Sequence, residues 1–241
     1  MRKVLDLFSG IGGFSLGLES TGEFETLAFV EIDSFCQKVL KKHWPHVPVY
    51  SDIRNIRIVE NDFDVLCGGF PCQDVSLAAV GNQKSILGDR SGLWFEYLRL
   101  IREGKPTWVI IENVENLRNK GLAQILEQLA EIGYDAEWHV IPAYVAGLPH
   151  VRNRIWILAY LMRNGLQRHS PFPLQTFSRF PWRENGRNAQ NFLDGWDIDN
   201  SVLLRSRNGI PNYMDRIKSL GNSVVPEIVY YLGLAIIETG L

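Results

Sequence analysis

Residues 6–13 read Asp-Leu-Phe-Ser-Gly-Ile-Gly-Gly and join an apolar run, Val4 to Phe8, to an amphipathic stretch. A glycine-rich turn between a strand and a helix lets the backbone approach a ligand and points helix N–H groups at an anion. The position that would complete a G-x-G-x-x-G dinucleotide fingerprint is Ser15. Phe8 can stack on an adenine, and Glu31 stands where a carboxylate binds ribose hydroxyls. The stretch predicts a site for a nucleoside-containing cofactor, with a tight packing turn as the alternative.

Short apolar runs alternate with amphipathic stretches over the first 160 residues. Further strands are expected at 26–30, 64–67, 108–111 and 155–158. Helices are expected after the turn, from a cap at Asp33 or Ser34 to Pro45, and over 122–132 before Gly133. Such alternation predicts an α/β fold with a doubly wound, mostly parallel sheet covered on both faces. From Asn164 to Asn212 the periodicity fails, and it returns in a helix at Val224 to Ile237 with Pro226 in its first turn.

The composition is that of an ordinary globular chain, with 46% hydrophobic and 22% charged residues in 241. The longest apolar stretch, Ile155 to Met162, is too short to cross a bilayer, and no apolar signal core precedes Asp6. The three cysteines form no C-x-x-C pair and leave one unpaired in any disulfide scheme. This usage indicates a reducing cytoplasm.

Charge is distributed unevenly along the chain. The net charge is −2, but Val151 to Lys218 carries 11 basic and 5 acidic residues. A positive segment on an acidic body indicates that one face meets a polyanion. A solvated arginine-rich surface is the alternative.

Cys72 is the candidate nucleophile. It lies in Gly-Gly-Phe-Pro-Cys-Gln, residues 68–73, after an apolar strand and a glycine pair. Ligands of such folds bind at the carboxyl edge of the sheet, where a thiolate can attack. Cys36 and Cys67 fall within a predicted helix and strand and are expected to be small buried thiols.

Two further motifs carry charged groups toward the same edge. Glu112-Asn113-Val114 is expected directly after the strand 109–111, where an acid can donate a proton or bind a base edge. Arg152 and Arg154 are two residues apart and so face the same side of a strand, which suits a phosphate or a base oxygen. A helix cap or surface acid, and a surface arginine pair, are the alternatives.

With these motifs in this order, the chain resembles the cytosine-5 DNA methyltransferases, over roughly the first 160 and last 25 residues. Gly221-Asn222-Ser223-Val224-Val225-Pro226 is similar to the closing motif of the family. Residues 208–218 resemble the short, phage-like members. His150 stands where the family usually has glutamine, and no catalytic role is assigned to it.

The resemblance implies S-adenosylmethionine as the methyl donor, released as S-adenosylhomocysteine. Phe8 would stack on its adenine, Glu31 would hold the ribose hydroxyls, and Asp52 with Ile53 would border the adenine edge. The full set of implied cofactor-binding residues is Asp6, Phe8, Gly10, Ile11, Gly12, Gly13, Glu31, Ile32, Asp52, Ile53, Pro71, Leu93, Asn222, Ser223 and Val224. No metal site is predicted.

The resemblance also implies a target cytosine flipped out of double-stranded DNA. Cys72 would attack C6, Glu112 would hydrogen-bond N3, and Arg154 would hold the base oxygen, with Arg152 beside it. The chain would divide into a catalytic and cofactor-binding domain (1–160), a small irregular target-recognition region (161–218) and a C-terminal helix that returns to the catalytic domain (219–241). The recognition region is assigned by its position and charge, and there Arg179, Arg183 and Arg187 are expected to contact DNA, with solvated arginines around an aromatic core as the alternative.

A cytoplasmic monomer of bacterial or phage origin is expected, away from membranes, and a cognate restriction endonuclease is a candidate partner. A tRNA cytosine-5 methyltransferase is the nearest alternative, because one branch of the family has the same motifs. A nicotinamide-dependent oxidoreductase is opposed by the missing third glycine and leaves Cys72 without a role. A noncatalytic relative would be expected to have lost Cys72 or Glu112.

Overall fold

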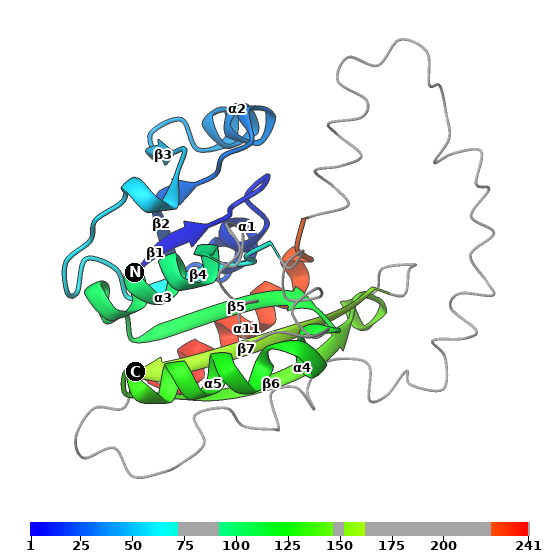
Figure 1. The fold of residues 1–241 in the computed structure, drawn as a ribbon. Coiled ribbons are helices and arrows are strands. Elements are labelled where there is room, and N and C mark those ends of the chain that lie inside the picture. Colours follow the sequence, from blue (N-terminus) through cyan, green and yellow to red (C-terminus); the bar gives the residue numbers. More distant parts are fainter. Residues whose placement is uncertain (72–91, 147–151, 162–222, 241) are drawn as a thin grey trace, which may run out of the picture.

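A computed structural model describes residues 1–71, 92–146, 152–161 and 223–240, which form a seven-stranded sheet between helices (Figure 1). The strands lie in the order β3-β2-β1-β4-β5-β7-β6. The first five in this order run parallel, and β7 is antiparallel to both β5 and β6. The predicted α/β fold with a doubly wound, mostly parallel sheet is therefore confirmed.

The elements have the following bounds. The strands are β1 (Arg2–Leu7), β2 (Phe24–Val30), β3 (Val49–Tyr50), β4 (Val65–Gly68), β5 (Trp108–Val114), β6 (Tyr134–Pro142) and β7 (Asn153–Leu161). The helices are α1 (Gly13–Glu19), α2 (Ser34–His43), α3 (Gly92–Gly104), α4 (Leu117–Lys120), α5 (Leu122–Glu131) and α11 (Pro226–Glu238), with 3-10 turns η1 (Ile53–Asn55) and η2 (Ala143–Ala146). None of the helices in the described ranges is long and apolar enough to span a membrane.

Alternate residues of the central strands feed two apolar cores, one on each face of the sheet. Leu5, Leu66 and Val109 pack with side chains of α3, α4 and α5. Val4 and Val65 belong to the other core, which side chains of α1 and α11 complete. This alternation is what strands covered on both faces require.

The order of the strands brings the important turns together. From β1 the chain proceeds outward to β2 and β3, then returns to place β4 on the other side of β1. The carboxyl ends of β1 and β4 are neighbours, since Leu7 pairs with Gly68. A reversal of this kind opens a crevice for ligands in doubly wound sheets. The turn after β1 and the segment leading to Cys72 both begin there.

Local signals placed the helix ends correctly. Asp33 caps α2, and its side chain accepts hydrogen bonds from the backbone N–H groups of Phe35 and Cys36. Gly133, with φ +88°, follows the end of α5, and Pro226 occupies the first position of α11.

Several strand boundaries differ from the prediction, since β2 begins at Phe24 rather than Thr26 and β7 spans Asn153–Leu161 rather than 155–158. The first strand ends at Leu7, because Phe8 has a φ of +53° and already belongs to the turn. Glu112, Asn113 and Val114 were expected after their strand but lie within β5, which extends because it pairs with β7 over its whole length. The sequence pattern did not predict β3, α3, α4 or β6.

Candidate active site

The conformation of the turn after β1 depends on two glycines in the left-handed region and on hydrogen bonds to the carboxylate of Glu31. Gly10 and Gly12 have φ values of +53° and +88°. The N–H of Gly10 donates to Oε2 of Glu31 over 2.7 Å, and the N–H of Asp33 donates to Oε1 over 2.7 Å. A carboxylate has about four acceptor sites, so two remain for further donors such as ribose hydroxyls. Glu31 thus ties the turn to the end of β2 and keeps acceptor capacity.

Two apolar residues of the predicted cofactor site, Phe8 and Ile32, differ in their burial. Phe8 is partly buried, with its ring centroid 6.3 Å from that of Tyr97, and Ile32 is 74% exposed. A Cβ added at Gly10 would meet no atom of the described residues within 4 Å, so among these residues the turn is open on that side. The partly exposed ring of Phe8, the turn at Gly10 and the carboxylate of Glu31 fit an adenosine-containing ligand.

Asp6 lies beneath the turn and is fully buried. Its Oδ2 accepts hydrogen bonds from the hydroxyl (2.7 Å) and N–H (3.3 Å) of Ser15, while Oδ1 has no hydrogen-bond partner. Burial raises the pKa of Asp6 to about 8, and the nearby charge of Glu31 adds to the rise. This predicted cofactor residue therefore braces α1 from behind the turn.

The structure also describes five other predicted cofactor residues. Asp52 caps η1 and pairs with Arg54 over 2.7 Å, and the Ile53 carbonyl accepts a hydrogen bond from Arg99 of α3. Leu93 packs partly against the same core as Phe8, while Pro71 is exposed and Ile11 partly buried.

The C-terminal segment meets the start of α1. A Cβ at Gly13 would lie 2.8 Å from Cγ2 of Val224 and 3.0 Å from the hydroxyl of Ser223. The structure therefore brings Ser223 and Val224 against the glycine turn.

A buried acid and an arginine face each other across β5 and β7. Glu112 is 7% exposed, and its Oε1 lies 3.0 Å from Nε of Arg154. This is an ion pair without aligned hydrogen-bond geometry, and within the described part of the chain Oε1 has no hydrogen-bond partner. Burial raises the pKa of Glu112 to about 7, although the charges of Arg154 and Arg152 oppose the rise. Both forms of the acid are populated near neutral pH, so Glu112 can donate or accept a proton.

Arg152 lies beside this pair and is partly buried. Burial and the charge of Arg154 lower the pKa of its guanidinium. The structure thus places Glu112, Arg152 and Arg154 near one another.

Asn113 and Gly69 also support this part of the site, and neither was predicted as a site residue. The side-chain N–H of Asn113 donates to the Phe70 carbonyl over 3.0 Å, and its Oδ1 accepts from the N–H of Val114. A Cβ at Gly69 would lie 2.8 Å from Oε2 of Glu112, so only glycine allows the acid to approach the backbone there. The available signals were the Gly-Gly pair and the asparagine beside the acid. Together they set the backbone just before Cys72.

Several predicted residues lie outside the described part of the chain: Cys72, His150, Arg179, Arg183, Arg187 and Asn222. Cys36 and Cys67 are both buried, as expected. Among the described residues no group of His, Cys, Asp and Glu side chains is arranged to hold a metal ion.

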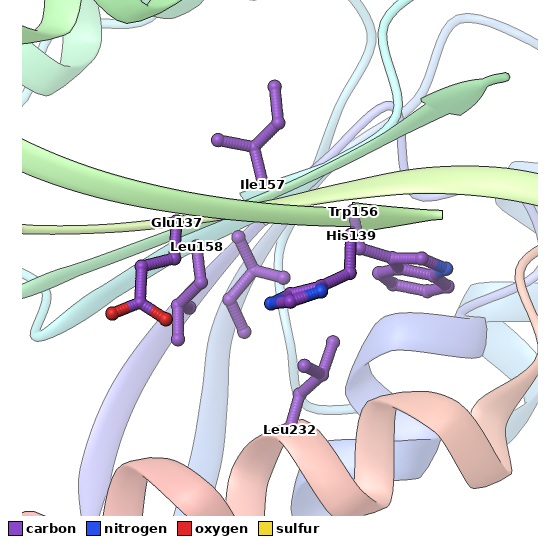
Figure 2. Close-up of a pocket in the computed structure, with 7 residues that line it drawn as sticks. Glu137, His139, Trp156, Ile157, Leu158 and Leu232 are labelled. Atoms are coloured by element: carbon purple, nitrogen blue, oxygen red, sulfur yellow. The ribbon is translucent and has the colours of Figure 1, made fainter. Parts of the chain in front are cut away.

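A separate hollow lies between β6, β7 and α11 (Figure 2). Glu137, His139, Trp156 and Leu232 are among the side chains that line it. It has room for no more than about one water molecule, and none of the predicted site residues lines it. It is not the nucleoside site.

Comparisons with known proteins converge on one family. The family model described as C-5 cytosine-specific DNA methylase matches residues 2–201. The type II methyltransferase M2.BsuMI of Bacillus subtilis is 38% identical over 170 residues, covering 67% of this chain and 43% of that protein. M.HhaI of Haemophilus parahaemolyticus is 36% identical over 185 residues, covering 73% and 55%. M.CviJI of Paramecium bursaria Chlorella virus IL3A is 30% identical over 232 residues, covering 95% and 58%.

Solved structures with the same fold include the Dnmt2 methyltransferase of S. pombe, with a TM-score of 0.67, 16% identity and full coverage of both chains. A putative DNA modification methyltransferase from an E. coli prophage has a TM-score of 0.54 and 23% identity, covering 67% of this chain and 47% of that one. The chain spans about half the length of the curated relatives it matches.

Proposed function

Because the chain belongs to the C-5 cytosine-specific DNA methylase family, we propose that it transfers a methyl group from S-adenosylmethionine to C5 of a cytosine in double-stranded DNA. The relatives named above are type II methyltransferases, and a tRNA substrate is not favoured. The observation that carries the proposal is the buried Glu112 beside Arg154, at the same sheet edge as the Glu31-bound turn.

The turn after β1 suits the cofactor. Phe8 offers a partly exposed ring, Glu31 retains free acceptor sites, and the backbone is open at Gly10. Ser223 and Val224 reach the same turn from the C-terminal segment. When bound, S-adenosylmethionine supplies an electrophilic methyl group to the base.

The charged pair suits the flipped cytosine. A protonated Glu112 can donate a hydrogen bond to N3 and relieve the charge that develops on the ring, and its pKa of about 7 keeps that form available. Arg154 can hold the base oxygen, because its guanidinium is only partly engaged by Glu112. Extrusion of the base is required because its ring carbons are inaccessible in the stacked duplex.

Cys72 supplies the covalent step of the proposal. Its thiolate adds to C6, and the resulting enamine makes C5 nucleophilic enough to take the methyl group. Loss of the C5 proton then expels the thiolate and restores the aromatic ring. Asn113 and Gly69 contribute by holding the backbone that leads to Cys72.

The remaining organisation is part of the same proposal. Residues 1–160 form the catalytic and cofactor-binding domain, 161–218 the target-recognition region, and 219–241 the returning helix. Arg179, Arg183 and Arg187 contact DNA. The enzyme acts as a cytoplasmic monomer, with a cognate restriction endonuclease as a candidate partner.

A duplex carrying 5-fluorocytosine at the target tests the chemistry. Fluorine cannot leave as a cation, so the wild-type protein should be trapped as a covalent adduct that mass spectrometry places on Cys72. Cys72→Ser should abolish turnover while the fold and cofactor binding are retained, because a serine hydroxyl is a far weaker nucleophile at neutral pH.

Cys36→Ala and Cys67→Ala are the matched controls and should lower stability at most, since both thiols are buried. The target site is first located by base-resolution methylation sequencing of DNA from cells that express the protein. An adduct on another residue, full activity in Cys72→Ser, or methylation of tRNA but not DNA would contradict the proposal.

A further inference from the structure

Trp44, directly after α2, lies against three elements that meet at the cofactor turn. Its backbone N–H donates to the Leu40 carbonyl and closes α2. Its ring centroid lies 5.2 Å from that of Phe29, a fully buried residue of β2, in an edge-on arrangement. Its indole Nε1 donates a hydrogen bond to Oε2 of Glu19, the last residue of α1, over 2.8 Å. The ring therefore has a single well-defined position.

The far edge of this ring lies directly against the glycine turn. A Cβ at Gly12 would stand 2.6 Å from Cζ3 and 2.7 Å from Cη2 of Trp44. Gly12 joins the turn to α1, since its N–H donates to the Ser9 carbonyl and its carbonyl accepts from the N–H of Leu16. Displacement of Gly12 would therefore shift both the turn and the first residues of the helix.

Glu19 fixes the indole from the other side. Its second oxygen, Oε1, accepts a hydrogen bond from the N–H of Thr26 over 3.0 Å. Thr26 stands where the register between β1 and β2 shifts by one residue. The carboxylate thus satisfies a backbone donor at this irregularity and holds Trp44 with its other oxygen.

We propose that Trp44 is a positioning residue for the S-adenosylmethionine site, setting the place of Gly12 and through it the Gly10–Glu31 contact. The inference rests on the proposed function, because it concerns the affinity of the same turn for the same cofactor. Trp44 acts through the turn and touches no reacting atom.

The position of Trp44 predicts a selective effect. It packs beside β2 and the start of α1, whereas Glu112 and Arg154 belong to β5 and β7, on the other side of β4. Loss of the ring edge leaves a void beneath Gly12, and interiors relax only partly into such voids. The loss should therefore appear in cofactor affinity and leave the chemical step intact.

Trp44→Phe removes both the ring edge at Gly12 and the Nε1 donor. We expect it to raise the dissociation constant for S-adenosylmethionine by about tenfold, the effect of one lost hydrogen bond with its packing. Calorimetry on the folded protein gives this constant directly. At saturating cofactor, kcat should stay within about twofold of wild type, so that KM for the cofactor changes alone.

Tyr134→Phe is the matched control. It also removes one buried hydrogen bond, from the Tyr134 hydroxyl to the Pro106 carbonyl, at the opposite edge of the sheet. It should lower Tm comparably and leave the dissociation constant unchanged. Glu19→Gln is a second test of the inference. It weakens the hydrogen bond to the indole of Trp44 but keeps the ring, so it should raise the dissociation constant for S-adenosylmethionine by a smaller factor.

An unchanged dissociation constant in folded Trp44→Phe, an equal rise in Tyr134→Phe, or a loss confined to kcat would overturn the inference. If Trp44→Phe does not fold, Glu19→Gln decides by the same criteria. If the wild type binds the cofactor and methylates DNA, but the dissociation constant is unchanged in the variants, only this inference is overturned. A wild-type protein that binds no cofactor overturns both it and the proposed function.

Discussion

At the residue scale, burial of the Asp6 carboxyl group disfavours its charged form, and its hydrogen bonds offset this effect only in part. Its Oδ2 accepts two hydrogen bonds from Ser15, but Oδ1 has none, and Glu31 lies near enough to add repulsion. Burial disfavours the charged form of a carboxyl group. Asp6 therefore keeps its proton to a pH well above that at which an exposed aspartate loses it.

The pH dependence of stability follows from this shift. The pKa of Asp6 rises from 3.8 to about 8 on folding, so the folded state binds more protons than the unfolded state between these values. This contribution to stability is fully present below about pH 4 and is lost as pH rises toward 8. Asp6→Asn keeps an acceptor for Ser15 but cannot titrate.

Urea unfolding at pH 5, 6.5 and 8 checks this expectation. The free energy of unfolding of the wild type should fall across the series relative to that of Asp6→Asn. Parallel pH profiles for the two proteins would show that Asp6 is ionised in the folded state.

At the scale of elements, α1 and α11 pack in close contact. A Cβ at Gly17 would collide with the Pro226 carbonyl oxygen and would lie 2.6 Å from Cβ of Val229. The absence of a side chain at Gly17 is what allows the C-terminal helix to reach α1. Ser223 and Val224 then follow, because they immediately precede that helix and lie against Gly13.

Gly17→Ala should lower the free energy of unfolding by about 1–3 kcal/mol, the usual cost of overpacking a close contact. Alanine is favoured over glycine in a helix by about 0.5–1 kcal/mol, so the collision decides the sign. Gly92→Ala in the first turn of α3 is the control, because a Cβ there meets nothing within 4 Å. Thermal and urea unfolding of both variants measure the difference; equal stabilities would mean that α11 moves away freely.

For the whole molecule, the distribution of charge matters more than its sum. The chain carries a net charge of −2, yet the segment 151–218 is basic. Under the proposed function, this local surplus is the part of the chain that would release counterions from DNA. The acidic remainder would disfavour contact elsewhere and so orient the protein on the duplex.

Arg179→Ala combined with Arg183→Ala should lower DNA affinity and flatten its dependence on salt. Two lost phosphate contacts reduce the slope of log K against log salt by about 1.8. Lys41→Ala with Lys42→Ala removes the same charge from the exposed end of α2 and should leave that slope unchanged. Binding titrations between 50 and 200 mM salt, about the range in which such slopes are measured, distinguish the pairs. If the two double variants have the same salt slope, Arg179 and Arg183 do not contact DNA phosphates and instead stabilise the fold of their own segment.

The class of fold and the place of the cofactor turn could be predicted from the sequence alone. The turn needs glycine at positions 10 and 12, where φ is positive. Asp33 supplies the acceptor that caps α2, and Pro226 marks the first turn of α11. Each signal is local, because it concerns the backbone conformation of a few adjacent residues. Signals of this kind can therefore be recognised in the amino-acid sequence without the tertiary structure.

The tertiary structure alone decided how the site is assembled. Glu112 lies within β5 and meets Arg154 because β5 and β7 pair antiparallel along their full length. Asn113 reaches the Phe70 carbonyl and Trp44 reaches Gly12 across more than thirty residues of chain. Such contacts depend on strand order and register, which arise from packing the whole sheet, and no spacing within a single motif encodes them.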